Sequence, residues 1–140
     1  DQLNVTEVAN DFASWAADNG LSGSDAVFTA DPDGDGVPNG LESFLGTLPG
    51  TSSAAMSNIA KTTNGISMSH SRNSDLASDI TASYQWSTDL STWSASGETV
   101  NGTTVTITTD DSVPGTTTAT ATVSGTDADS VFIKVNVSND

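Results

Sequence analysis

The chain has 140 residues, the size of one ordinary domain, and a formal net charge of −15 from 18 acidic and 3 basic residues. This charge argues against nucleic acid and anionic membrane surfaces as partners, because both attract clustered Lys and Arg. No apolar run approaches the ~20 residues of a membrane-spanning helix, so we expect no membrane insertion.

Composition also bears on where the protein is found. Acid-rich, Lys-poor, Ser/Thr-rich chains without cysteine are common outside bacterial cells, so we expect a secreted protein, extracellular or at the cell surface. The absence of cysteine gives no disulfide argument for or against secretion. The sequence begins at Asp1 without a signal-like segment, which indicates a processed or excised chain.

Residues 1–50 have a helical pattern and form the first of two expected parts. The segment NVTE, Asn4 to Glu7, resembles a capping box in which the Glu7 side chain reaches back to Asn4. Apolar residues then fall on one helical face before a stop signal at Gly20; they are Val8, Phe12, Trp15 and Ala16. An undistinguished connector at residues 21–30 and an acidic loop follow. A short second helix carries Leu41, Phe44 and Leu45 and ends at Gly46 and Pro49.

Residues 51–140 form the second expected part, in which apolar and polar residues alternate from about residue 57. Alternation with a period of two is typical of strands with one buried and one exposed face. The alternating residues are Ile66, Met68 and His70; Ile80, Ala82, Tyr84 and Trp86; Val105 and Ile107; Ala119, Ala121 and Val123; and Val131, Ile133, Val135 and Val137. About six such strands separated by Gly/Asn/Asp/Pro clusters predict an antiparallel β-sandwich. We therefore expect a mainly β fold with a helical N-terminal third, the two parts packed as one module.

The acidic loop TADPDGDGVPNGLE, Thr29 to Glu42, matches the EF-hand calcium pattern. Counted from Asp31, acidic residues occupy positions 1, 3, 5 and 12, and glycine occupies position 6, where the loop turns sharply. Calcium takes about six to eight hard oxygen ligands, and alternate residues of a tight loop can surround one ion. Without a cation, four carboxylates this close would repel one another. The predicted Ca²⁺ ligands are Asp31, Asp33, Asp35, the carbonyl of Val37, Glu42, and Asn39 through a water molecule.

A solvated acidic turn is the alternative interpretation of this loop, but Asn39, Glu42 and a helix in register favour calcium. Two features separate the loop from a paired EF-hand. Pro38 lacks the backbone N–H that position 8 gives to a partner loop, and the sequence contains no second loop with this spacing. We therefore expect a lone structural site and not half of a calcium sensor. Lone loops of this form resemble those of dockerins and thrombospondin type 3 repeats.

A longer resemblance involves both ends of the chain. The segments FASWAADNGLSGSDAVFTADPDGDGVPNGLESFLGTLP, YQWSTDLSTW and VFIKVNV are similar to a module at the C-termini of many secreted proteins of Verrucomicrobia and Planctomycetes. The matching features are the helix with Phe12 and Trp15, the loop Asp31 to Glu42, the exit Leu45 to Pro49, the segment Tyr84 to Trp93 and the strand Val131 to Val137. Residues 50–78 and 94–128 have no counterpart. The resemblance implies a non-catalytic, extracellular accessory module, often attached to polysaccharide-degrading enzymes or surface proteins.

We expect no enzyme activity, because the sequence contains no evident set of nucleophile, base and orienting group. His70 is the only imidazole and is in phase with apolar strand residues, which is typical of a half-buried strand position. Asp110 with Asp111, or Asp127 with Asp129, is a candidate glycosidase pair. These acids lie in turn-like segments, where solvated side chains are the usual case.

Two functions remain open, and the preferred one is self-association. Sheet edges recruit further strands unless Lys, Pro or bulges block them, and the Thr-rich runs TTVTITT and TTTATATVS contain no charge. The N-terminal QLNV alternates Leu3 and Val5, as a strand lent to a neighbouring copy would. The hypothesis is a calcium-stabilised extracellular structural module that assembles into a filament or surface layer by strand addition.

The alternative is a carbohydrate-binding accessory module of a secreted polysaccharide-degrading enzyme. Tyr84, Trp86 and Trp93 are close in the sequence, and exposed aromatic rings can stack against a polysaccharide. Tyr84 and Trp86 share the apolar phase of their strand, however, so core packing is their default role.

Overall fold

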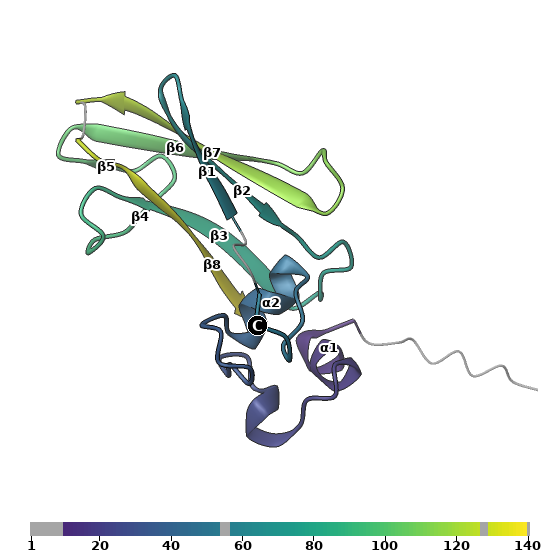
Figure 1. Ribbon diagram of the computed structural model, residues 1–140. Coiled ribbons are helices and arrows are strands. Elements are labelled where there is room, and N and C mark those ends of the chain that lie inside the picture. The colour runs from purple at the N-terminus through teal and green to yellow at the C-terminus, as the bar shows by residue number, and fades with distance from the viewer. Residues whose placement is uncertain (1–9, 54–56, 127–128, 140) are drawn as a thin grey trace, which may run out of the picture.

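The computed structural model describes residues 10–53, 57–126 and 129–139, in which helices come first and strands follow (Figure 1). The helices are α1 (Phe12–Asp18), the short 3-10 helix η1 (Gly23–Ala26) and α2 (Asn39–Leu45). The strands are β1 (Ser57–Thr62), β2 (Gly65–Ser71), β3 (Ile80–Ser87), β4 (Ser94–Ala95), β5 (Thr99–Val100), β6 (Thr103–Asp110), β7 (Thr116–Gly125) and β8 (Phe132–Asn139). The predicted mainly β fold is confirmed. Among the residues described, no helix has the length and apolar character needed to cross a membrane.

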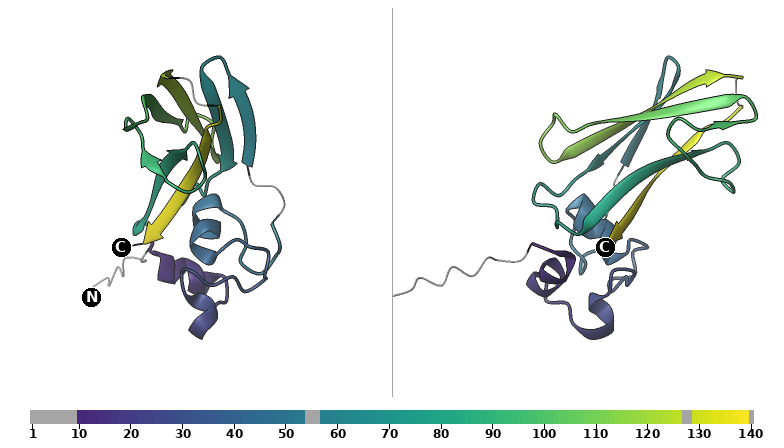
Figure 2. Two further views of the ribbon diagram at one scale, coloured as in Figure 1. Left: turned by 90° about the vertical axis from the view of Figure 1, so that its left-hand side faces the viewer. Right: turned by 180° about the vertical axis from the view of Figure 1, so that it is seen from behind.

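The strands form two antiparallel sheets, one ordered β1-β2-β7-β6-β5 and the other β4-β3-β8. In the larger sheet, the register of β6 and β7 runs from Thr103 opposite Gly125 to Asp110 opposite Thr118. Alternate side chains of each strand point towards the opposite sheet, as the period of two predicts. Trp86 of β3 packs there with β6 and β7 residues that are fully buried, so the two sheets share one apolar core (Figure 2).

The helices pack against one end of the sheets (Figure 2). Phe12, Phe44 and Leu45 are buried against Ile80, the first residue of β3. Trp15 and Leu41 also pack against these residues, so the apolar faces of the two helices meet in one cluster. Backbone hydrogen bonds join the two regions, because the N–H of Asn73 donates to the carbonyl of Phe44 at 2.8 Å. The acidic loop is therefore attached to a body that includes both helices and the smaller sheet.

The start of the first helix differs from the prediction. Asn10 and Asp11 are not helical, and α1 begins at Phe12 with Asp11 as its N-cap. The Asp11 carboxylate accepts the N–H of Ser14 at 2.8 Å, which satisfies a donor that the first turn leaves free. A continuous helix that starts from a cap at Asn4 is therefore wrong. The proposed capping box, Asn4 to Glu7, lies outside the described residues.

The position of the sheet edges also differs from the sequence interpretation. Strand β7, which contains TTTATATVS, lies between β2 and β6 and has no free edge. Strand β6, which contains TTVTITT, is covered by β7 on one side and by β5 and residues 96–97 on the other. The N–H of Gly97 donates to Val105 at 2.8 Å, and the hydroxyl of Ser96 accepts the N–H of Ile107 at 2.7 Å. In the described part of the chain, the longest strands at sheet edges are β1 and β8.

Candidate metal centre

Three carboxylates meet in the loop before α2. Oxygens of Asp31, Asp33 and Asp35 all lie within 4.8 Å of one another. Asp31 shapes the loop, because its Oδ1 accepts the N–H of Gly34 at 3.0 Å and its Oδ2 accepts the N–H of Gly36 at 2.8 Å. Gly36 has φ of 91°, a left-handed conformation that glycine adopts without strain. The predicted acidic cluster is thus formed, and it can hold a metal ion.

Asp35 is fixed from two sides. Its Oδ1 accepts the N–H of Val37 at 2.8 Å, and its Oδ2 accepts the N–H of Ser53 at 2.6 Å. The Ser53 N–H is the main reason that the pKa of Asp35 lies below its usual value. Asp35 therefore joins the loop to the chain that leaves α2 and holds one negative charge in place.

Asp33 has the opposite electrostatic environment. Burial raises the pKa of its carboxyl, the N–H of Asp35 opposes that shift, and the carboxylates of Asp31 and Asp35 add to it. Its Oδ1 accepts the N–H of Asp35 at 3.2 Å, whereas its Oδ2 is buried without a hydrogen-bond partner among the described residues. An unpartnered carboxylate oxygen of this kind can ligate a metal ion.

Glu42 supplies a fourth carboxylate from α2 but does not belong to the 4.8 Å cluster. Its residue is 0% exposed, and burial followed by the charges of Asp33 and Asp35 raises its pKa to about 7. Its Oε1 accepts a long hydrogen bond of 3.4 Å from the hydroxyl of Thr47, and its Oε2 is buried without a partner among the described residues. Burial of such a group destabilises the fold unless a proton or a cation neutralises it.

The remaining two predicted ligands, Val37 and Asn39, are buried and hydrogen-bonded to neighbouring groups. Val37 is buried, and its N–H is bonded to Asp35, while the role of its carbonyl stays a prediction. Asn39 is 0% exposed, and its amide nitrogen donates to the carbonyls of Asp25 at 2.7 Å and Val27 at 3.0 Å. Asn39 therefore fixes the connector. Its Oδ1 has no partner among the described residues, and its water-mediated role stays a prediction.

The connector before the loop has a structural role that its sequence does not suggest. Phe28 packs edge-on against Phe12, with ring centroids 5.0 Å apart, and its ring also covers Gly40. A Cβ at Gly40 would lie 2.2 Å from the Phe28 ring, so only glycine permits this contact. The N–H of Gly40 also donates to the carbonyl of Phe28 at 2.9 Å. The only sequence signals are a single apolar residue in a polar connector and a glycine in the first turn of a helix.

Comparison with known protein families, characterised proteins and solved structures finds no significant match to this chain. The resemblance to the secreted calcium-loop module therefore stays a prediction. The candidate metal centre is supported by the positions and the environment of its own carboxylates.

His70 and the aromatic residues occupy structural positions. His70 is 4% exposed, and its Nδ1 must carry a proton because it lies 2.8 Å from the carbonyl of Ser71. Its Nε2 then accepts the hydroxyl of Tyr84 at 2.6 Å. Trp86 is 1% exposed in the core, and Trp93 lies under the ammonium of Lys134, 4.2 Å from the ring centroid. The three aromatic residues therefore form no common exposed platform.

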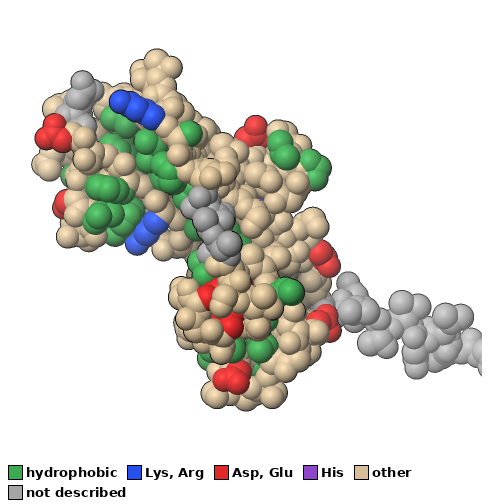
Figure 3. Space-filling model, viewed as in Figure 1, with side chains coloured by type: hydrophobic (Ala, Val, Ile, Leu, Met, Phe, Trp, Pro, Cys, Tyr) green, Lys and Arg blue, Asp and Glu red, His purple; other side chains and the backbone are tan. Residues whose placement is uncertain are grey.

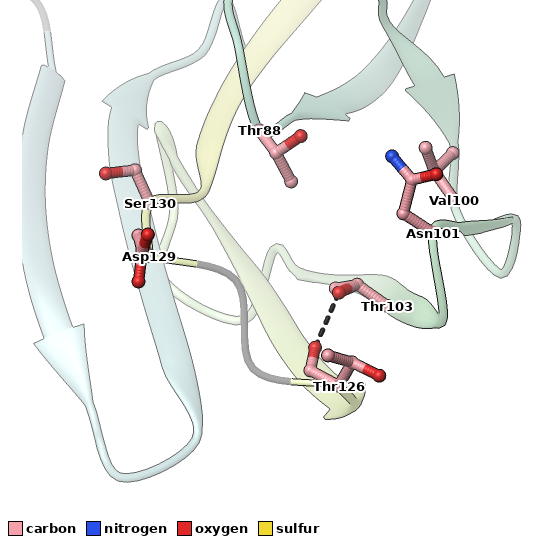
Figure 4. Close-up of a pocket in the computed structure, with 7 residues that line it drawn as sticks. All are labelled: Thr88, Val100, Asn101, Thr103, Thr126, Asp129 and Ser130. Carbon is pink, nitrogen blue, oxygen red and sulfur yellow. Dashed lines mark hydrogen bonds between the residues drawn. The ribbon is translucent and has the colours of Figure 1, made fainter.

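Three of the four acids in the candidate glycosidase pairs lie in the described residues. Asp111 accepts the hydroxyl of Thr117 at 2.6 Å, and the side chain of Ser112, followed by its backbone N–H, lowers the pKa of Asp110. Asp127 lies outside the described residues. Asp129 lines a hollow of ≈ 340 Å³ whose other lining residues carry no second carboxylate (Figure 4). These are Thr88, Val100, Asn101, Thr103, Thr126 and Ser130.

Proposed function

We propose that this protein is a non-catalytic structural module, a β-sandwich preceded by an EF-hand-like calcium loop. The observation that carries the proposal is the environment of Glu42, a fully buried carboxyl with an unpartnered oxygen near the cluster of Asp31, Asp33 and Asp35. None of these four acidic groups has a basic group among its hydrogen-bond partners. A bound cation would neutralise their mutual repulsion and make the arrangement stable.

Calcium is the cation that this set of ligands suits best. All of the proposed ligands are oxygens, since the chain has no cysteine and its one histidine is bonded to Tyr84 in the core. Hard oxygen ligands favour Ca²⁺ and Mg²⁺ over zinc or copper. Ca²⁺ accepts an irregular set at roughly 2.4 Å, whereas Mg²⁺ requires near-ideal octahedral geometry. A loop that offers carboxylates, a backbone carbonyl and water fits Ca²⁺.

In this function the ion holds the loop and α2 in a fixed arrangement. The proposed ligands come from the loop and from α2, and Asp35 is bonded in addition to Ser53 beyond α2. An ion bound by Asp31 and Glu42 together would fix the angle at which α2 leaves the loop. That angle sets the contact of Phe44 with Ile80 at the start of β3.

We further propose that the module is extracellular and self-assembling, with copies joined by strand addition into a filament or surface layer. Two long edge strands, β1 and β8, support this proposal. The predicted donor, Asp1 to Val5, lies outside the described residues. The carbohydrate-binding alternative has less support, because Trp86 lies in the core.

Sedimentation velocity and electron microscopy of the full chain test assembly. In millimolar calcium we expect growth with protein concentration, and less growth in chelator or after deletion of Asp1 to Val5. A full-length protein that stays monomeric at high concentration in calcium would exclude assembly and favour the carbohydrate-binding alternative.

A further inference from the structure

One flank of the two sheets leaves part of the inner apolar surface uncovered. Ile59 of β1 lies directly opposite Met68 of β2, so both side chains are on the same face of the sheet. Met68 lies opposite Ala119 of β7, on the face that packs against the smaller sheet. Met68 is only 6% exposed, whereas Ile59 is 60% exposed. Among the described residues, the inward face of β1 is therefore left exposed at Ile59, although it continues the core.

The cause is a difference in width between the sheets. The larger sheet has five strands and the smaller one three, and β8 is the last strand of the smaller sheet. The inward residues Ile133 and Val135 of β8 are only half-buried. Figure 2 shows β8 on the same side of the molecule as the β1–β2 hairpin, and Figure 3 shows hydrophobic side chains at the surface there. One more strand beside β8 would lie over Ile59.

We propose that this flank is the acceptor site for residues 1–9 of a second copy, which pair with the free edge of β8. The inference rests on the proposed self-assembly and names the surface that receives the lent strand. Leu3 and Val5 would point inward onto Ile59, and the free backbone groups of β8 would gain partners.

The length and charge of the segment fit this acceptor. Nine extended residues span about 30 Å, slightly more than the eight residues of β8. The segment contains Asp1 and Glu7 and no base. Two of the three basic residues of the chain, Lys61 of β1 and Lys134 of β8, lie on the two strands that border the flank. Lys61 lies opposite Ile66 on the same face as Ile59 and can attract an acidic strand, whereas Lys134 lies over Trp93 on the other face of β8.

The direction of the added strand favours a segment from a neighbouring copy over residues 1–9 of the same chain. The carbonyl of Asn10 accepts the N–H of Ser78 at 2.7 Å, and Ile80 is paired with Asn139 at the end of β8. Residues 1–9 of the same chain would approach β8 from its C-terminal end and run parallel to it. Every strand pair in the described residues is antiparallel, and a segment from a second copy is free to add in that direction.

Disulfide trapping in the full chain tests the site, because the protein has no cysteine of its own. A Leu3→Cys chain is mixed with an Ile59→Cys chain in calcium under mild oxidation. We expect a cross-linked heterodimer in roughly tenfold higher yield than with a Val113→Cys partner, since binding raises the effective concentration of the two thiols. Val113 is a matched control because its side chain is also 60% exposed.

The possible outcomes distinguish failure of the proposed acceptor site from failure of the proposed assembly. Equal yields with Ile59→Cys and Val113→Cys, from protein that still assembles, overturn the acceptor site and leave assembly standing. A further control is a single chain that carries both Leu3→Cys and Ile59→Cys. If this chain forms an intramolecular disulfide at high dilution, the donor segment comes from the same chain and not from a second copy. Wild-type protein that stays monomeric in calcium overturns the proposed assembly together with the acceptor site.

Discussion

Replacement of Glu42 by Gln should stabilise the calcium-free protein at alkaline pH and abolish its stabilisation by calcium. Without calcium, Glu42 has a folded-state pKa of about 7, against 4.5 for the free group. The folded state then holds a proton that the unfolded state has lost, so stability falls as pH rises from about 4.5 to about 7. The difference corresponds to at most about 3 kcal/mol. For a domain of this size that is a shift of about 10 °C in melting temperature.

Thermal melts at about pH 5 and about pH 8, in chelator and in calcium, measure this effect. In chelator at the higher pH, the Glu42→Gln protein should melt above the wild type, because the amide is neutral and nearly isosteric. In calcium this difference should largely disappear, because only the wild type gains about 3 kcal/mol when the ion is at a hundredfold excess over its dissociation constant. Glu98→Gln, at an exposed position, is the matched control. A calcium-free wild type with the same stability at both pH values would refute this reasoning.

Three further predictions concern the loop and its supports. Asp35→Ala should remove the calcium response and weaken the attachment to Ser53, which calcium-dependent melting of the variant would measure. After chelation, hydrogen exchange should rise in α1 and α2 before it rises in the strands, and equal protection in both regions would contradict the fastening role of the ion. Gly40→Ala should destabilise the protein by about 1–3 kcal/mol, because the added methyl group overlaps the Phe28 ring. The control is Gly50→Ala, where no atom lies within 4 Å of the added Cβ, and equal melting temperatures for the two variants would exclude the packing explanation.

Features that depend on local sequence were predictable. The helix α2 follows from three apolar residues in phase and a terminal glycine, and Gly46 does end it in a left-handed conformation. The strands β2, β6 and β7 follow from alternation, because each buries one face. The cluster of Asp31, Asp33 and Asp35 follows from spacing within one tight loop, where alternate side chains must converge.

Features that depend on contacts distant in sequence were not predictable. The sheet order decides which strands have free edges, and nothing within β6 or β7 reveals their neighbours. The amide of Asn39 is bonded to the carbonyls of Asp25 and Val27, a role that the calcium pattern alone does not suggest. The start of α1 was misplaced because the structure caps the helix that carries Phe12 with Asp11.

Calorimetric titration of calcium into chelator-treated protein tests the central claim most directly. We predict one site with a dissociation constant of roughly 10⁻⁴ to 10⁻³ M, the range of extracellular calcium modules. Binding near pH 7 should also release about half a proton, because Glu42, with a pKa of about 7, is half protonated in the free protein and must be ionised to bind the ion. Titrations in two buffers with different ionisation enthalpies measure that proton. No binding heat, or a site that takes magnesium as tightly as calcium, would contradict a calcium centre in this loop.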